Sequence, residues 1–277
     1  MSATLDAAKS DDHDLLTARY GAADIPAASP LNEVIRSLMA HRSVRNYLPT
    51  ALPDGTLETL IAAAQAAATS SNMQYWSVVA VTDPATKKIM AEVAGGQQHI
   101  NQCPLLLVFL ADQSRLKRVI DTAGKPMPTL DYQEAFTVAA IDAGLAAQNA
   151  AIAAESLGLG TVYIGALRND PERVAKAIGL PQHVMAVFGL CVGYANPATL
   201  SDIKPRLPQA AVLHHERYET ADETAAIARY DAVLSAFSRR QAMDSDTWTG
   251  RVLQRLTGSN GREGMRAAMR RLGFELK

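Results

Sequence analysis

An apolar stretch from Phe136 to Leu157 constrains the fold of this chain more than any other segment. It is apolar nearly all the way round, a pattern shared by membrane spans and by helices buried inside proteins. Polar residues interrupt it and glycines follow it, at Asp142, Gln148, Asn149, Glu155, Gly158 and Gly160. We therefore expect a helix buried in the core or at a subunit interface, and no membrane-spanning segment.

Composition argues against several classes of function. The 277 residues include 27 Lys and Arg against 28 Asp and Glu, so a net charge of -1 provides no overall field for nucleic acid or an anionic membrane. Cys103 and Cys191 lie in apolar stretches outside any disulfide or metal-binding spacing, and we expect buried thiols. The first residues are acidic and lack the apolar segment of a secretory signal. These features favour a cytoplasmic protein.

Hydrophobic periodicity predicts an α+β fold with a sheet flanked by helices. The first core helix is expected to begin at Ser29 and Pro30, with a buried face formed by Leu31, Val34, Ile35, Leu38 and Met39. Further helices are expected from residues 54, 84 and 170, and strands over residues 76–81, 104–111, 162–165 and 184–194. Residues 115–132 have no clean period and suggest a mobile loop.

The chain is expected to have three parts. Residues 1–28 form an N-terminal extension of uncertain order, and residues 29–208 form the core. Residues 209–277 form a helical arm with two amphipathic helices, the second using Val252, Leu256, Met265, Met269 and Leu272.

Two short basic segments are candidates for an anion site. One is His41-Arg42-Ser43-Val44-Arg45, just after the first core helix, and the other is Lys204-Pro205-Arg206. Cations are favoured near a helix C-terminus in any case, and the second segment alone would be a solvated pair. If the two segments converge, however, the repulsion between their cations must be offset by an anion, and a phosphate is the natural occupant.

Polar residues elsewhere suggest contacts to a planar heterocycle. Ser70, Ser71 and Asn72 lead into a buried strand, and Gln97 follows the Gly95-Gly96 turn; ordinary turns would also explain both. The Gly158-Leu159-Gly160 cluster follows a helix and enters a strand, the reverse of a dinucleotide-binding turn. The chain has no nucleophile elbow, Walker A or HExxH motif, and its six His residues show no metal-binding spacing.

Taken together, the motifs resemble the oxygen-insensitive NADPH nitroreductase and NADPH-flavin oxidoreductase family. The resemblance runs in collinear order over roughly residues 32 to 276. It is carried by His41-Arg42-Ser43-x-Arg45, Ser70-Ser71, Gly95-Gly96-Gln97-x-His99, Ala147-Gln148-Asn149-Ala150, Tyr163-Ile164-Gly165, Leu180-Pro181-Gln182-His183, Phe188-Gly189-Leu190-Cys191-x-Gly193 and Lys204-Pro205-Arg206-Leu207-Pro208.

This resemblance implies an intertwined homodimer with a central, mostly antiparallel sheet and one FMN per subunit. The phosphate of FMN would be held by His41, Arg42, Ser43, Lys204 and Arg206. Arg45 would lie near N1 and the C2 carbonyl of the flavin. The ring and ribityl chain would be contacted by Ser70, Ser71, Gln97 and the backbone of Ile164, Gly165 and Ala166.

The implied activity is two-electron reduction of nitroaromatics and quinones by NADPH in a ping-pong cycle, without a catalytic side chain. The arm would wrap the partner subunit, and Arg239 and Arg240 would contact the 2′-phosphate of NADPH. Two alternatives use the same residues: a flavin reductase that supplies reduced FMN to a partner monooxygenase, and a flavin-binding dimer that has lost turnover.

The chain departs from the family pattern beside the expected flavin. Asn72 and Met73 stand where an aromatic residue and a leucine are frequent, Trp76 replaces a small residue, and Ala166 stands where glycine is frequent. These departures leave the range of substrates open.

Overall fold

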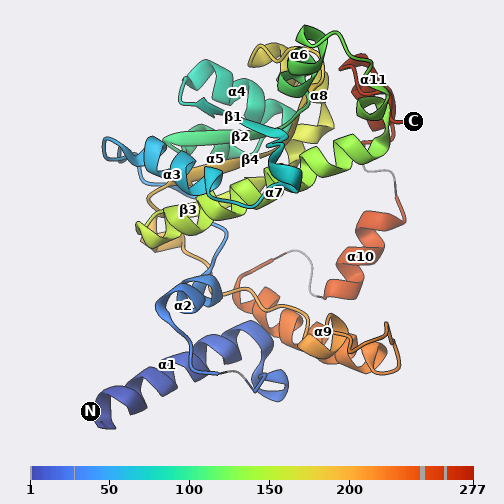
Figure 1. The fold of residues 1–277 in the computed structure, drawn as a ribbon. Coiled ribbons are helices and arrows are strands. Elements are labelled where there is room, and N and C mark those ends of the chain that lie inside the picture. The colour runs from blue at the N-terminus through green and yellow to red at the C-terminus, as the bar shows by residue number, and fades with distance from the viewer. Residues whose placement is uncertain (1, 28, 244–246, 259–260) are drawn as a thin grey trace. The chain divides into compact units, whose positions relative to one another are not determined.

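The computed structural model describes residues 2–27, 29–243, 247–258 and 261–277 (Figure 1). The chain forms two compact units. The smaller unit comprises Met1–Arg42 and Ser201–Asn260, and the larger comprises Ser43–Leu200 and Gly261–Lys277.

A four-stranded antiparallel sheet forms the centre of the larger unit. Its strands lie in the order β1 (Trp76–Val81), β2 (Leu105–Asp112), β4 (Val184–Gly193) and β3 (Gly160–Ile164). Every pair of neighbours is antiparallel, and the register of β2 against β4 shifts between Phe109 and Leu110. The predicted α+β class and antiparallel sheet are confirmed.

Alternation along β2 divides the core of the larger unit into two layers. Leu105, Leu107 and Phe109 face a cluster that includes helices α3 (Thr56–Gln65) and α7 (Gln133–Ser156). Leu106, Val108 and Leu110 face the opposite cluster, to which α4 (Pro84–Val93), α5 (Gln98–Gln102) and α8 (Pro171–Ala177) contribute. Both faces of the sheet are therefore covered by helices (Figure 1).

Helix α7 packs through alanines, as its apolar sequence predicts. Its buried residues are Ala135, Ala139, Asp142, Ala143, Ala146, Ala147, Ala150, Ala151 and Ala154. By length and composition it is the one helix in the described ranges that could cross a membrane, but this evidence is weak because core helices pass the same test. Its packing against α3 and the sheet fits the predicted core helix.

The remainder of the larger unit includes one element that the sequence did not predict. Helix α6 (Ser114–Thr122) lies inside the segment expected to be a mobile loop, so that expectation is wrong for these residues. Its only buried residue is Ser114: Leu116 and Ile120 are half-buried, and Val119 is 64% exposed. Short 3-10 turns lie at Ser70–Asn72, Pro128–Asp131, Gly165–Asn169 and Pro197–Thr199, and helix α11 covers Met265–Arg271.

Helices make up the smaller unit, which contains α1 (Ser2–Tyr20), α2 (Glu33–Ala40), α9 (Glu223–Arg240) and α10 (Trp248–Leu256), with 3-10 turns at Ala22–Asp24 and Gln209–Ala211. The N-terminal extension thus contains a helix. The Asp12–Arg36 ion pair connects α1 to α2, and Asp24 pairs with Arg229 of α9.

Two helix predictions are corrected, one within the smaller unit and one that involves both units. Helix α2 begins at Glu33, capped by the Asn32 side chain, rather than at Ser29. Its expected buried face is partly exposed, with 58% of Val34 and 38% of Ile35 accessible. The single helix expected to use Val252 through Leu272 is two helices, α10 in the smaller unit and α11 in the larger.

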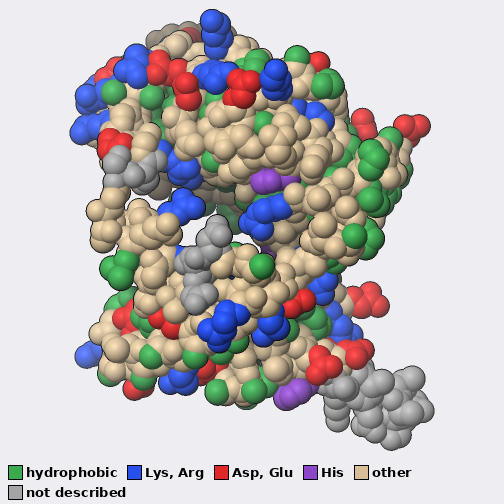
Figure 2. Space-filling model, turned by 180° about the vertical axis from the view of Figure 1, so that it is seen from behind, with side chains coloured by type: hydrophobic (Ala, Val, Ile, Leu, Met, Phe, Trp, Pro, Cys, Tyr) green, Lys and Arg blue, Asp and Glu red, His purple; other side chains and the backbone are tan. Residues whose placement is uncertain are grey.

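The expectations for cysteine burial and surface charge agree with the structure. Cys103 and Cys191 are both free and buried. Figure 2 shows basic and acidic side chains interspersed over the face drawn, in keeping with the net charge of -1.

The contact between Gly160 and Val44 gives a first prediction. A Cβ added at Gly160 would lie 2.4 Å from Cγ2 of Val44, so Gly160→Ala is expected to reduce the free energy of unfolding. Overpacking of this kind costs about 1–3 kcal/mol. Urea denaturation of wild-type and variant proteins measures the difference. Gly144→Ala is the matched control, because a Cβ there meets no described atom within 4 Å. The cost should shrink in a Val44→Ala background, and an equal cost in both backgrounds would contradict the steric explanation.

Candidate functional site

The segment after Arg42 is fixed against the sheet of the larger unit. Ser43 forms a parallel bridge with Thr161, and the Val44 amide donates to the Thr161 carbonyl at 2.8 Å. Val44 and Tyr47 are buried in the core, and the Tyr47 hydroxyl donates to the Cys191 carbonyl. Gly160 makes this close approach possible, because it has no side chain.

Arg45 remains exposed while its neighbour Val44 is buried, as expected in an extended segment. It lies near His99, whose pKa is lowered first by burial and then by the Arg45 charge. His99 Nε2 is buried, and no described group accepts or donates a hydrogen bond there. The sequence motif included His99, but we had not predicted it as a site residue; only its place two residues after Gln97 pointed to it.

The turn before Gln97 depends on two glycines. Gly95 and Gly96 have φ of 78° and 82°, values that L-residues with side chains rarely adopt. Gln97 then occupies the N-cap position of α5 without a capping hydrogen bond from its side chain, and it is half-buried. Because the Arg45 charge reaches His99, Arg45 and the Gly95–His99 turn lie in the same region of the larger unit.

Asp142 of α7 organises the loop that leads into β1. Its buried carboxylate, 1% exposed, accepts hydrogen bonds from the amides of Ser70 at 3.1 Å and Tyr75 at 3.2 Å. Between these two points Ser71, Asn72 and Gln74 have φ of 49°, 54° and 52°. These left-handed conformations are costly for residues with a Cβ. The two hydrogen bonds to Asp142, here called the Asp142 clamp, therefore hold a strained, exposed loop in place.

Two of the residues near this loop that depart from the family pattern differ in their surroundings. Trp76 is 8% exposed and lies against Phe109, with ring centroids 6.1 Å apart. Its indole therefore fills the core beneath α7. Asn72 is exposed on the loop.

The predicted backbone contacts follow β3 directly. Ile164 ends β3 and is buried, and Gly165 and Ala166 begin the 3-10 turn Gly165–Asn169. The Arg168 guanidinium lies 3.3 Å from the position of a Cβ at Gly165 and donates to the Val187 carbonyl. Arg168 was not predicted as a site residue.

In the smaller unit, Arg19 of α1 links His41, at the start of the first predicted phosphate segment, to the second segment, Lys204–Arg206. Its guanidinium donates to the carbonyls of Lys204 at 2.6 Å and His41 at 3.1 Å. Its own carbonyl accepts from the Arg206 amide at 2.8 Å. His41 and Lys204–Arg206 therefore converge on one residue, which the sequence reasoning did not identify.

Two guanidinium groups of this unit have capacity for an anion. Arg42 Nε is buried, and no described residue accepts a hydrogen bond from it. The Arg206 side chain is exposed, and its guanidinium donates a long hydrogen bond to the Pro205 carbonyl at 3.4 Å. Lys204 Nζ lies 5.9 Å from the centroid of the Phe237 ring, within the range of a cation–π contact.

The predicted NADPH residues lie in the last turn of α9 and are exposed. Arg239 donates to the Ser235 hydroxyl, and Arg240 forms a loose ion pair of 3.8 Å with Asp202. Surface pairs of this kind contribute little to stability, so these side chains can be recruited by a ligand.

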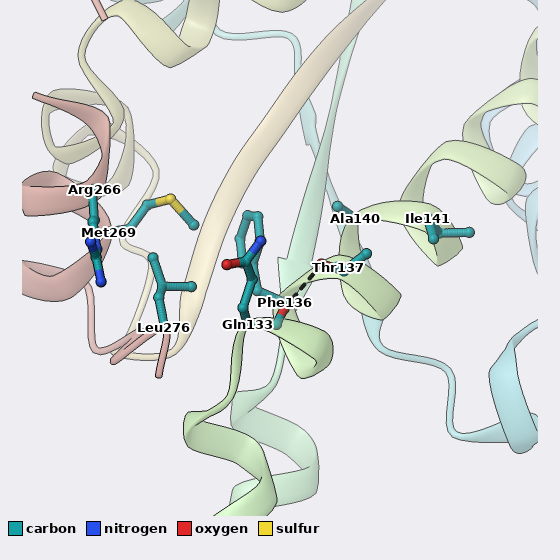
Figure 3. Close-up of a pocket in the computed structure, with 8 residues that line it drawn as sticks. All are labelled: Gln133, Phe136, Thr137, Ala140, Ile141, Arg266, Met269 and Leu276. Atoms are coloured by element: carbon teal, nitrogen blue, oxygen red, sulfur yellow. Dashed lines mark hydrogen bonds between the residues drawn. The ribbon is translucent and has the colours of Figure 1, made fainter. Parts of the chain in front are cut away.

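A cavity of about 650 Å³ lies elsewhere in the larger unit, between α7 and α11 (Figure 3). Phe136 and Ile141 line one side, and Met269, Leu276 and Arg266 line the other. None of the predicted flavin residues borders it.

Comparison with known proteins identifies the family. The profile of the nitroreductase family matches residues 38–194, and that of the C-terminal domain of the nitroreductase family matches residues 204–277. The chain belongs to the nitroreductase family. It is therefore an oxidoreductase, and its sheet and helices are the nitroreductase fold.

Named nitroreductase-family relatives cover most of the chain. It is 38% identical to "FMN reductase (NADPH)" of Bacillus subtilis over 80% of this chain and 91% of that protein. It is 37% identical to "Oxygen-insensitive NADPH nitroreductase" of Salmonella typhimurium over 83% and 93%. The structure of the NADPH:FMN oxidoreductase of Vibrio harveyi complexed with NAD+ has a TM-score of 0.79 at 32% identity, over 89% of this chain and 100% of that one.

The Asp142 clamp gives the second prediction. Asp142→Ala removes the acceptor of the Ser70 and Tyr75 amides, and a hydrogen bond to a charged group contributes about 1.5–3 kcal/mol. We expect lower stability in urea and faster hydrogen exchange at both amides. Asp83→Ala, which removes an exposed cap from the Thr86 amide, should leave the exchange at residues 70 and 75 unchanged. Unchanged exchange in Asp142→Ala would contradict the clamp.

Proposed function

We propose that this nitroreductase-family protein uses FMN as its cofactor and NADPH as its electron donor to reduce nitroaromatics and quinones in a ping-pong cycle. One observation carries this proposal: Arg45, after the bridge from Ser43 to β3, lies near His99 beyond the Gly95–Gln97 turn. Motifs far apart in sequence, each predicted to contact flavin, thus meet at the sheet.

The residues present fit a flavin mononucleotide. Its phosphate is a dianion, and the smaller unit has Arg42, Arg206 and Lys204 together with His41. The buried, unpartnered Nε of Arg42 is a donor for a charged acceptor. Ser43, with its backbone fixed against β3, is the fifth proposed phosphate ligand.

A second set of residues would hold the ring and ribityl chain. Ser70, Ser71 and Gln97 offer hydroxyl and amide groups, and the backbone of Ile164, Gly165 and Ala166 offers N–H and carbonyl groups. Asp142 holds the first pair on their loop, and the glycine turn fixes Gln97. Arg45 would supply a positive charge to the ring.

When bound, FMN would accept a hydride from NADPH and deliver two electrons to the second substrate. The chain's own residues orient both molecules and provide charge. Arg45 would stabilise the anionic form of the reduced cofactor by electrostatic attraction. No side-chain nucleophile is required.

The arm and the exposed apolar faces support a homodimer. Val34 and Ile35 of α2 in the smaller unit, and Ile141 and Leu145 of α7 in the larger, are large apolar side chains between 38% and 58% exposed. Surfaces of this kind mark interaction sites. The division into a flavin-binding core of residues 29–208 and a partner-wrapping arm of residues 209–277, and a cytoplasmic location, remain predictions.

The second candidate is a flavin reductase that supplies reduced FMN to a monooxygenase. It is favoured by the names of two relatives in Bacillus subtilis, "FMN reductase (NADPH)" and "FMN reductase [NAD(P)H]", the latter 42% identical. A flavin-binding dimer without turnover is a third reading, and the complete set of predicted cations speaks against it.

Anaerobic reduction of the purified full chain tests the proposed activity. We expect the released flavin to be FMN, and NADPH to bleach the bound flavin until a nitroaromatic or quinone restores its colour. NADPH oxidation without bleaching would contradict the proposal. A kcat/KM for free FMN far above that for the nitroaromatic would favour the flavin reductase, and FMN binding without reduction would favour the third reading.

The proposed role of α9 gives the third prediction. Arg240→Ala is expected to raise the apparent KM for NADPH about tenfold but to change that for NADH little, since only NADPH carries a 2′-phosphate to receive the charge-assisted hydrogen bond. Arg255→Ala, an exposed arginine in the last turn of α10, is the matched control. Equal effects on both nucleotides would defeat the assignment.

A further inference from the structure

Arg19, near the C-terminus of α1, is a charged residue that the proposed function has not yet used. It is 5% exposed, and charged side chains are seldom so buried unless they are paired or hydrogen-bonded. Its NH1 group donates to the Lys204 carbonyl at 2.6 Å. Its NH2 group donates to the carbonyls of Met39 at 2.6 Å and His41 at 3.1 Å.

The segment from Lys204 to Arg206 is held at three successive residues. Arg19 NH1 binds the Lys204 carbonyl, the Tyr230 hydroxyl donates to the Pro205 carbonyl at 3.1 Å, and the Arg206 amide donates to the Arg19 carbonyl. Both the main chain and the side chain of Arg19 therefore take part. With its backbone fixed in this way, the segment has little freedom in where it presents its two basic side chains.

A purely structural role explains only part of this arrangement. The carbonyls of Met39 and His41 lie at the C-terminal end of α2, where any cation is favoured by the helix dipole. Capping of α2 gives no reason for the bond to Lys204, which comes from the other part of this unit. The planar guanidinium can bond to the end of α2 and to Lys204 at once, since its two terminal nitrogens donate in different, fixed directions.

We propose that Arg19 is a positioning residue for the phosphate of the cofactor. It sets the spacing between His41 and the Lys204–Arg206 segment, and so prearranges the cations before the phosphate arrives. This inference rests on the proposed function, because that function assigns the phosphate to these residues.

The position of Arg19 in the chain adds a consequence. The family profile begins to match at residue 38, so Arg19 lies outside the matched region. The N-terminal extension would therefore contribute to cofactor affinity. A binding site whose side chains are already ordered binds its ligand more tightly, because less conformational entropy is lost on binding. Loss of Arg19 should therefore weaken the binding of FMN.

The test compares two flavins that differ in one group. Full-length chain freed of flavin is titrated with FMN and with riboflavin, which lacks the phosphate, and binding is followed by quenching of flavin fluorescence. In Arg19→Met we expect the Kd for FMN to rise about tenfold, equivalent to about 1.4 kcal/mol, and the Kd for riboflavin to stay unchanged. A general loss of structure would weaken both.

Arg36→Gln is the matched control. Arg36 ion-pairs with Asp12 of α1 at 2.7 Å, so this variant loosens the extension without removing the bonds to His41 and Lys204. We expect it to retain the wild-type preference for FMN over riboflavin. An equal loss of preference in both variants would mean that docking of the extension, and not Arg19 itself, is responsible, and would overturn the proposal.

Further outcomes separate the inference from the proposed function. Wild-type chain that binds neither flavin would overturn the proposed function. A wild-type preference for FMN that persists in Arg19→Met would overturn only the role of Arg19. If Arg19→Met does not fold, Arg19→Lys decides, because one ammonium group cannot reproduce the two-nitrogen fork: a reduced preference supports the proposal, and an unchanged one overturns it.

Discussion

Close packing of α7 against the sheet is the constraint on which the larger unit depends. Alanines at the buried positions let the helix approach the strands, and the apolar side chains of β2 fill the space that remains. In this tight layer Asp142 is a buried carboxylate, and it is tolerated because two backbone amides satisfy it. The helix therefore fixes both the core and the strained loop that carries Ser70 and Ser71.

Charge is used locally in this protein. The net charge of -1 offers no long-range attraction for a polyanion, and the face drawn in Figure 2 intersperses both signs. Within the smaller unit, however, backbone carbonyls accept hydrogen bonds from the charged Arg19 guanidinium, while the guanidinium groups of Arg42 and Arg206 have donors that no described carboxylate satisfies. A single small dianion suits such a site better than a long charged polymer does.

Regular elements with a strong apolar signal or a proline start were predictable from the sequence. The four strands and helices α3, α4, α7 and α8 are found close to their expected positions, because each has a continuous apolar run, an apolar period or a proline start. Helix α6 was missed because it buries almost nothing, and the start of α2 was misplaced because Asn32 competes with Ser29 as a cap.

The candidate site was predictable only in its motifs. The sequence identified the basic and polar segments, and the family resemblance gave them roles. It did not reveal the residues that hold those segments in place, Asp142 and Arg19, because their partners are backbone groups. A carbonyl or an amide has no residue-specific signature in a sequence.

The smaller unit is built from two distant parts of the chain, Met1–Arg42 and Ser201–Asn260. During synthesis its first helix must wait until more than two-thirds of the protein has been made before Arg19 can meet Lys204. Contacts so far apart in sequence must close a long loop before they form, so they tend to form late. All four strands of the larger unit lie in sequence between these two parts, so its sheet can assemble first, whereas α11 joins it only at the end of synthesis. A chain stalled before residue 204 would therefore have a formed sheet but no complete set of cations.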